Sequence, residues 1–412
     1  MEENRKKICI LYCYIGELPW YFPLFAKSCQ KNSDIDFLII GDQDHVTSAD
    51  IPNLLFIKKS LAEINALATA RLQLQTAIHY PYKLCDFKPA YGIIFSDYLK
   101  DYDFWGFGDI DVILGDLGNF YTPEMLEQYD VISARHSYIS GFLTLFKNND
   151  YVNRLYEKSK DYHKVFSSAK HYCFDECSFE FARLAEGKSI LDLNSEIESL
   201  THVVKKLEAQ GALRPFFDHL VVEDVPGNLE WNNGKLFYNN KFEALLYHLI
   251  LFKDNPYLLK PEWEKVPDHY FIHSYYISAY HPDSETGQQE RISNEQKKNQ
   301  EISCIAREYH QLLNSSDSNA LSSNGNYTGT YLSLCPSDNN LPVEVRHAES
   351  DLNIMFTGMG NFKLKPAGND TFISAINGAI TEVSFQYDLT QSTNMLVFHQ
   401  LGAFKKFKLH KV

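Results

Sequence analysis

Short apolar runs alternate with helix-like segments over the first 280 of the 412 residues, and this alternation limits the fold more than any other feature. The run from Ile8 to Tyr14 is uninterrupted, as expected for a central parallel strand that is covered on both faces. Strands that alternate with helices predict an α/β sheet of βαβ units. Further strands are expected at 35–40, 54–57, 104–108 and 130–134, and helices at 20–30, 61–80 and 91–98.

The pattern changes after Tyr280. Residues 281–313 are polar and predict an amphipathic helix, and 314–326 have the Ser- and Asn-rich composition of a linker. From Tyr327 onward, β-like runs recur about every ten residues, which predicts a small antiparallel barrel or sandwich. The expected domains are therefore an α/β domain at 1–280, a helical and Ser/Asn-rich linker at 281–326, and a β-domain at 327–412.

Charge and hydropathy exclude several classes of protein. The chain has 53 acidic and 39 basic side chains, a net charge of −14, and no Lys/Arg run, so we expect no nucleic-acid partner. No stretch approaches the roughly 18 apolar residues of a membrane span. The run at 8–15 lacks a signal-peptide cleavage site, and the eight cysteines are scattered without a CxxC pair. We expect reduced cysteines and a cytoplasmic location.

Two aspartates follow the strand expected at 104–108. Asp109 and Asp111 can both reach one divalent cation if the strand ends in a turn, and such oxygen ligands suit Mg²⁺ or Mn²⁺ together with phosphate oxygens. The alternative is a solvated turn, because 42–44 and 101–103 have the same Asp-x-Asp spacing. Apolar residues flank only 109–111 on both sides, and buried unpaired carboxylates are costly. This context favours the metal site.

Two stretches resemble the nucleotide-sugar half of GT-A glycosyltransferases, namely Tyr82-Lys-Leu-Cys-Asp-Phe-Lys-Pro-Ala-Tyr-Gly92 and Asp103-Phe-Trp-Gly-Phe-Gly-Asp-Ile-Asp111. The likeness is strongest to an uncharacterised bacterial branch with a Trp-Gly-(Phe/Tyr)-x-Asp-x-Asp signature, and the family-eight galactosyl- and glucosyltransferases look like more distant relatives. It covers about residues 7–280. It implies a Rossmann-like mixed sheet flanked by helices, a nucleoside-diphosphate sugar donor (a UDP-sugar is favoured), a divalent metal on its diphosphate, and a glycan, peptide or small-molecule acceptor.

Carried over position by position, the resemblance assigns donor and metal contacts. Asp109 would face the ribose and the metal, and Asp111 would be a metal ligand. His248 would complete the metal site and Lys253 would meet the diphosphate, but their spacing differs from the family motif by one residue. His273 is therefore the second choice, and either histidine could instead be a core residue bonded to a backbone carbonyl. The other implied donor contacts are Tyr12 and Gly16 around the base, Asp42 at the base edge, and Lys83, Asp86 and Lys88 near the ribose and phosphates.

The acceptor side is predicted from two later segments. Residues 135–146, with His136 and Gly141, resemble the segment that lines the acceptor pocket. Asp175 and Glu176 follow an aromatic cluster, and in an inverting transferase either could be the general base on the acceptor hydroxyl. A retaining enzyme does not need a base there, and the pair could instead be acids at a helix N-terminus. In the same way, Lys88 before a proline could be the surface start of a helix.

Two other functions stay open. A nucleotidyltransferase of similar fold also uses acids and Mg²⁺, although Tyr14-Ile-Gly-Glu-Leu-Pro19 lacks the Gly-rich, basic loop that such enzymes usually show. A non-catalytic carbohydrate-binding protein would use its β-domain. That domain resembles the small C-terminal domain of bacterial serine-β-lactamase-like proteins in Tyr327-Thr-Gly-Thr-Tyr331 and Leu396-Val-Phe-His-Gln400. The resemblance implies no shared chemistry, so an accessory or oligomerisation module is expected. Seven basic and seven acidic residues leave the domain neutral and freer to self-associate as a homo-oligomer.

Overall fold

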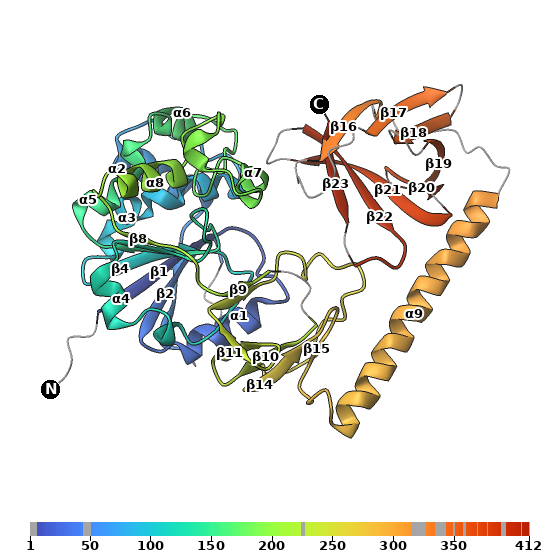
Figure 1. Cartoon of the computed structure of the whole chain (residues 1–412), viewed down its shortest axis with the longest axis horizontal. Coiled ribbons are helices and arrows are strands. Elements are labelled where there is room, and N and C mark those ends of the chain that lie inside the picture. The colour runs from blue at the N-terminus through green and yellow to red at the C-terminus, as the bar shows by residue number, and fades with distance from the viewer. Residues whose placement is uncertain are drawn as a thin grey trace. The chain divides into compact units, whose positions relative to one another are not determined.

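The computed structural model describes residues 6–43, 51–223, 227–314, 327–333, 343–348, 351–356, 360–368, 370–376, 378–388, 393–404 and 406–411. The chain divides into two compact units (Figure 1). The first is Met1–Phe252 with Lys260–Ala279, and the second is Lys253–Leu259 with Tyr280–Val412. Except for Asn314, the predicted linker at 314–326 lies outside the described residues.

A mixed sheet with the strand order β3-β2-β1-β4-β7-β6-β8 forms the centre of the first unit. Strands β1 to β4 are parallel, whereas β7 is antiparallel to both β4 and β6. This confirms the predicted fold class for the first part of the chain. The strands are β1 Ile8–Tyr14, β2 Ile35–Gly41, β3 Leu54–Lys58, β4 Phe104–Gly108, β6 Val131–Ser133, β7 Leu143–Lys147 and β8 Pro215–Phe216.

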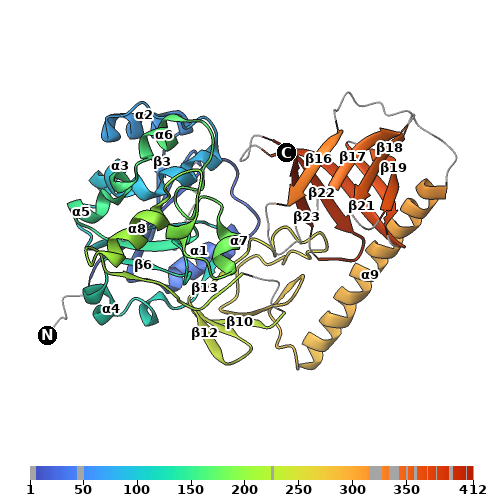
Figure 2. The same cartoon turned by 45° about the horizontal axis from the view of Figure 1, so that its top comes forward.

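Both faces of this sheet are buried under helices (Figures 1 and 2). Successive side chains of a strand point to opposite faces, so Cys9 and Leu11 of β1 enter one core while Ile10 and Tyr12 enter the other. The uninterrupted apolar run of β1 follows from this double cover. The helices of the unit are α1 Phe22–Lys31, α2 Leu61–Leu72, α3 Tyr91–Ile94, α4 Pro123–Gln128, α5 Asp150–Asn153, α6 Tyr162–Ser167, α7 Phe181–Ala185 and α8 Leu200–Ala209.

Two predicted helices are shorter than expected, and several connections are 3₁₀ helices. The helix expected at 91–98 is divided into α3 and the 3₁₀ helix η2. The helix expected at 61–80 begins with a capping box between Ser60 and Glu63 but ends at Leu72, because Gln73 adopts a left-handed backbone with φ of 51°. The 3₁₀ helices are η1 Pro81–Ala90, η2 Ser96–Tyr98, η3 Leu117–Asn119, η4 Leu155–Lys158 and η5 Ile190–Asp192.

Two smaller sheets complete the first unit. One has the order β5-β13-β9 and the other β12-β11-β10-β14-β15. Strand β13 is antiparallel to β5 and sets His248 opposite Val112, which brings residue 248 beside the turn after β4. These strands are β5 Val112–Leu114, β9 Val221–Val222, β10 Leu229–Asn232, β11 Lys235–Tyr238, β12 Phe242–Ala244, β13 Leu246–His248, β14 His269–Ile272 and β15 Ile277–Ser278.

The second unit contains a closed antiparallel barrel, in which β16 pairs with β23 to complete the ring. This confirms the predicted all-β part as a barrel rather than a sandwich. Helix α9, Glu285–Asn314, runs alongside the barrel (Figure 2), and the hydroxyl of Tyr309 donates to Glu382 at 2.6 Å. The strands are β16 Gly329–Ser333, β17 Val343–Ala348, β18 Asp351–Phe356, β19 Gly360–Gly368, β20 Thr371–Ile376, β21 Ala379–Asp388, β22 Thr393–Gln400 and β23 Phe407–Lys411.

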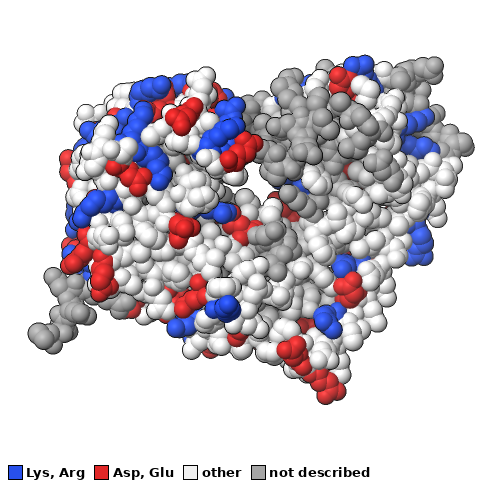
Figure 3. Space-filling view, in the orientation of Figure 1, with Lys and Arg blue, Asp and Glu red and all other residues white. Residues whose placement is uncertain are grey.

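Three structural findings bear on the class of protein. Within the described ranges, no helix combines the length and the apolar character that crossing a membrane requires. Charged side chains of both signs are interspersed on the face of the first unit seen in Figure 3. The described cysteines, namely Cys9, Cys13, Cys29, Cys85, Cys173, Cys177 and Cys304, are free thiols.

Because α9 packs on the barrel, a truncation that separates the two units should end at Ala279, before α9 begins. We expect residues 1–279 to unfold in one cooperative transition, since both cores of the main sheet lie within them. Circular dichroism during a urea titration measures this. An insoluble product or a broad, non-cooperative transition would contradict the expectation.

Candidate functional site

The strand order of the main sheet reverses at β1, because β2 follows on one side and β4 lies on the other. In open α/β sheets the loops after the carboxyl ends of the strands at such a point form the ligand site. In this chain they are the loop after β1 and the turn at 109–111 after β4. The candidate site is built from these two loops outward.

The loop after β1 is tied to the end of β2. The N–H of Gly16 donates to Asp42 Oδ1 at 2.9 Å, and Gln43 Nε2 donates to the carbonyl of Gly16 at 2.5 Å. Gly16 has φ of +111°, which favours glycine. Gly16 and Asp42 are both exposed, so the structure brings these two predicted residues together at the strand ends.

Tyr12 requires a correction. Its side chain is 1% exposed and packs edge-on against Phe25 in the core, so it cannot contact a nucleobase. The alternation of β1 contained this information, because Tyr12 shares a strand face with Ile8 and Ile10.

The ammonium group of Lys88 lies at the centre of a buried charge cluster. Its Nζ is 2.7 Å from Asp109 Oδ1 and 3.5 Å from Asp175 Oδ2, and it donates to the carbonyl of Gly141 at 2.9 Å. Burial alone would lower the pKa of Lys88, but Asp109 and its other anionic neighbours raise that pKa well above the ordinary value. Lys88 therefore stays charged and joins three segments that are distant in sequence. Lys88 is 5% exposed, so the alternative that it marks the surface start of a helix is wrong.

Asp175 and Glu176 form a pair of acids beside Lys88. Burial raises the pKa of Asp175 well above the ordinary value, although Lys88 lowers it in part. Burial also raises the pKa of Glu176, although the N–H of Gly141, which donates to Glu176 Oε1 at 2.8 Å, lowers it. Both shifts favour the protonated form of the acid more than solvent would. Helix α7 begins only at Phe181, so the pair is not at a helix N-terminus.

The backbone of Gly141 lies against the side chains of Asp175 and Glu176. A Cβ atom on residue 141 would lie 2.9 Å from Asp175 Oδ2 and 3.1 Å from Glu176 Cδ. Any larger side chain would therefore displace the acids. The neighbouring predicted residue His136 is exposed on the same loop, five residues earlier.

Asp111 and His248 meet at the other side of the turn after β4. His248 Nε2 is 3.5 Å from Asp111 Oδ2, and both residues are 7% exposed. His248 Nδ1 is 2.9 Å from Glu223 Oε1, and Glu223 also pairs with Arg135. A carboxylate on the far ring nitrogen orients an imidazole in the way that metal-binding histidines are usually oriented. Sequence reasoning missed Glu223, because no motif surrounds it.

The donor atoms fit an ion that arrives with a phosphate ligand. Among the described residues, no three His, Cys, Asp or Glu side chains form a ready metal site. Asp111 and His248 supply two potential ligands, and Asp109 is held by Lys88. Mg²⁺ is commonly held by one or two carboxylates while substrate phosphates and water complete its shell. Asp111 and His248 are therefore described residues that could hold such an ion.

The remaining predicted residues lie elsewhere. Lys83 and Asp86 have no exposed surface and pair with each other at 2.7 Å, so we withdraw them as direct donor contacts. His273 follows β14, where its ring stacks on Tyr276 at 4.2 Å. Lys253 belongs to the second unit, and its contact with a diphosphate stays a prediction.

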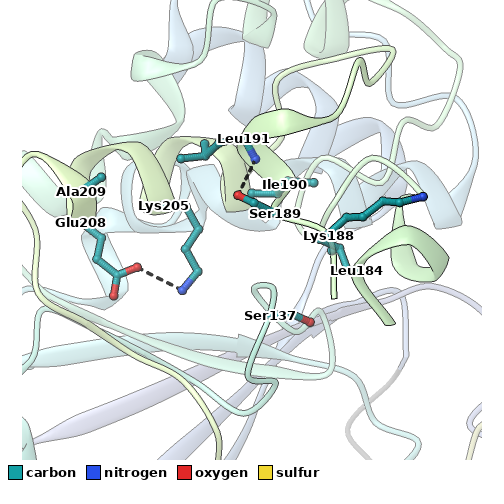
Figure 4. Close-up of a pocket in the computed structure, with 9 residues that line it drawn as sticks. All are labelled: Ser137, Leu184, Lys188, Ser189, Ile190, Leu191, Lys205, Glu208 and Ala209. Atoms are coloured by element: carbon teal, nitrogen blue, oxygen red, sulfur yellow. Dashed lines mark hydrogen bonds and ion pairs between the residues drawn. The ribbon is translucent and has the colours of Figure 1, made fainter. Parts of the chain in front are cut away.

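A pocket of about 430 Å³ lies between α7, η5 and α8 (Figure 4). It reaches the candidate acceptor loop through Ser137, and Leu184 and Ile190 give it an apolar wall. Figure 4 shows Lys205 directed toward Glu208, with which it pairs at 3.0 Å. No motif marks these residues in the sequence, so the pocket could not be predicted from it.

Residues 10–278 match the model of a family of unknown function, DUF6625, and the chain belongs to that family. No curated protein matches the chain significantly.

Solved structures that resemble the chain include three glycosyltransferases. The galactosyltransferase LgtC, solved with donor and acceptor sugar analogs, is 12% identical over 52% of this chain and 75% of its own, with a TM-score of 0.27. Mouse xyloside xylosyltransferase 1 is 9% identical over 59% and 97%, with a TM-score of 0.32. The glycosyltransferase GlyE of Streptococcus pneumoniae TIGR4 is 12% identical over 52% and 45%, with a TM-score of 0.24.

The raised pKa of Asp175 makes a prediction about stability. The native state holds this proton more tightly than the unfolded chain, whose aspartates titrate near pH 4, so stability is full below that pH and falls as pH rises toward the native pKa. Asp175→Asn should therefore raise the free energy of unfolding at pH 8 and leave it nearly unchanged at pH 4. Urea titrations at both pH values measure this. A loss of stability at pH 8 would show that Asp175 is ionised and stabilises Lys88.

Proposed function

We propose that the protein is a metal-dependent glycosyltransferase that moves a sugar from a nucleoside-diphosphate sugar to an acceptor. One observation carries the proposal: Asp111 and His248 converge at the carboxyl edge of the sheet where the strand order reverses, beside the buried Lys88 cluster. A carboxylate and an oriented imidazole at that edge suit a cation that carries a phosphate ligand.

The donor would lie across the ends of β1 and β4. Gly16 and Asp42 are exposed beside each other and would meet the base and ribose, for which a UDP-sugar is favoured. Asp111 and His248 would hold Mn²⁺ or Mg²⁺, which when bound neutralises the diphosphate and stabilises the leaving group. Glu223 would keep His248 Nε2 directed at the ion by holding its Nδ1.

The acids would act on the sugar side of the diphosphate. Lys88 would hold Asp109 in place beside the ribose and the ion through their ion pair of 2.7 Å. Glu176 is half-buried, whereas Asp175 is 3% exposed, so Glu176 is the better candidate for contact with substrate and Asp175 for tuning its surroundings. Gly141 and His136 would border the acceptor. For the second unit we propose an accessory role or self-association.

The metal assignment predicts a defined loss on mutation. Asp111→Asn should weaken binding of UDP in the presence of Mn²⁺ on the order of 10–100-fold, because it removes an anionic ligand from the ion. Isothermal titration calorimetry measures the affinity. Asp101→Asn is the matched control, since it makes the same change in the Asp-x-Asp at the opposite end of β4 and should bind like wild type. Equal affinity of the two variants would contradict the assignment.

A further inference from the structure

Lys83 and Asp86 form an ion pair with no exposed surface, and both lie on η1. Besides Asp86, the ammonium group of Lys83 donates to the carbonyls of Val165 at 2.8 Å and Lys170 at 2.5 Å. All three donors of the ammonium group are therefore used. Lys83 therefore binds η1 to Val165 and Lys170, which flank residues 166–169.

Asp86 binds the segment that follows. Its carboxylate accepts the N–H groups of Tyr172 at 3.0 Å and of Phe174 at 2.9 Å. The Nδ1 atom of His171 lies 3.1 Å from Asp86 Oδ1. Together with Lys83, Asp86 thus holds the segment 170–174, which ends one residue before Asp175.

The backbone between the two bonded amides needs such support. Cys173 has φ of +54°, a left-handed conformation that non-glycine residues rarely adopt and that the surroundings must hold in place. Beyond this turn, Asp175 Oδ2 lies 3.5 Å from Lys88 Nζ, and Lys88 is on the same 3₁₀ helix as Lys83 and Asp86. Helix η1 therefore contacts the segment 170–175 at two points, through Asp86 and through Lys88.

We propose that Lys83 and Asp86 are positioning residues, which hold the segment 170–174 on η1 and thereby fix Asp175 and Glu176 against Lys88 and Gly141. The catalytic consequence rests on the proposed function, whereas the mechanical role does not. Buried ion pairs can often be replaced by apolar residues without loss of stability, so a fully buried pair that binds a turn beside two acids is better explained by conformational specificity.

The charge state of the pair supports this role. Burial would raise the pKa of Asp86, but His171 and Lys83 outweigh burial and lower that pKa below the ordinary value. Asp86 is therefore an ionised acceptor, and backbone N–H groups bond more strongly to a carboxylate than to a neutral oxygen.

The double variant Lys83→Met, Asp86→Asn tests the proposal, because it removes both charges and keeps one amide oxygen as an acceptor. Alkylation of Cys173 by iodoacetamide, followed by mass spectrometry, reports on the segment directly, since this thiol is 2% exposed in the native turn. We expect the rate at Cys173 to rise at least tenfold. Asp130→Asn is the matched control, because Asp130 also accepts a backbone N–H and pairs with a cationic side chain, both of Arg214. This variant should leave Cys173 protected.

Donor turnover gives the second readout. We expect kcat to fall at least tenfold while KM for the donor changes less than about twofold, because Asp111 and His248 are untouched. Unchanged alkylation of Cys173 together with unchanged kcat would overturn the proposal. If wild type turns over no donor, the proposed function fails, and the alkylation still decides the positioning role.

Wild-type protein provides a test that does not depend on the variant folding. Hydrogen exchange of the amides of Tyr172 and Phe174 should be as slow as that of the central strands, since both are bonded to a buried carboxylate. Fast exchange of these amides in the native protein would overturn the proposal by itself.

Discussion

The ion pair of the Lys88 ammonium group with Asp109, together with its two other polar contacts, is the interaction on which the candidate site depends. Lys88 contacts three segments that are distant in sequence. It pairs with Asp109 in the turn after β4, donates to the Gly141 carbonyl, and lies near Asp175. A buried cation that loses its partner costs roughly 3–5 kcal/mol, so the fold is strongly biased toward bringing these segments together. The acids beside the strand ends are thus a consequence of how one buried charge is satisfied.

The same cluster contains a conflict between stability and function. Asp175 and Glu176 both have pKa values raised chiefly by burial, which means that their charged forms are unfavourable in the native state. A fold selected only for stability would replace these groups. Such a local cost in stability is typical of active sites.

Much of the fold, but little of the site geometry, could be predicted from the sequence. Five strands of the main sheet and the strands of the barrel follow from local apolar patterns, whereas β7 and β8 were not predicted. The position of Asp109 after β4 followed from the strand that precedes it. The burial of Lys83 and Asp86 could not be predicted, because such residues are usually exposed and their partners lie in segments distant in sequence. His248 was proposed from a family resemblance, and its place beside Asp111 depends on the pairing of β5 with β13, which no local pattern reveals.

The most direct test of the central claim is a panel of sugar nucleotides incubated with the full-length protein and Mn²⁺, with release of nucleoside diphosphate as the readout. The account predicts release from at least one donor, favoured to be a UDP-sugar, and loss of that release when EDTA removes the ion. Release that persists in EDTA, or release of pyrophosphate from a nucleoside triphosphate in place of any sugar-nucleotide turnover, would contradict it.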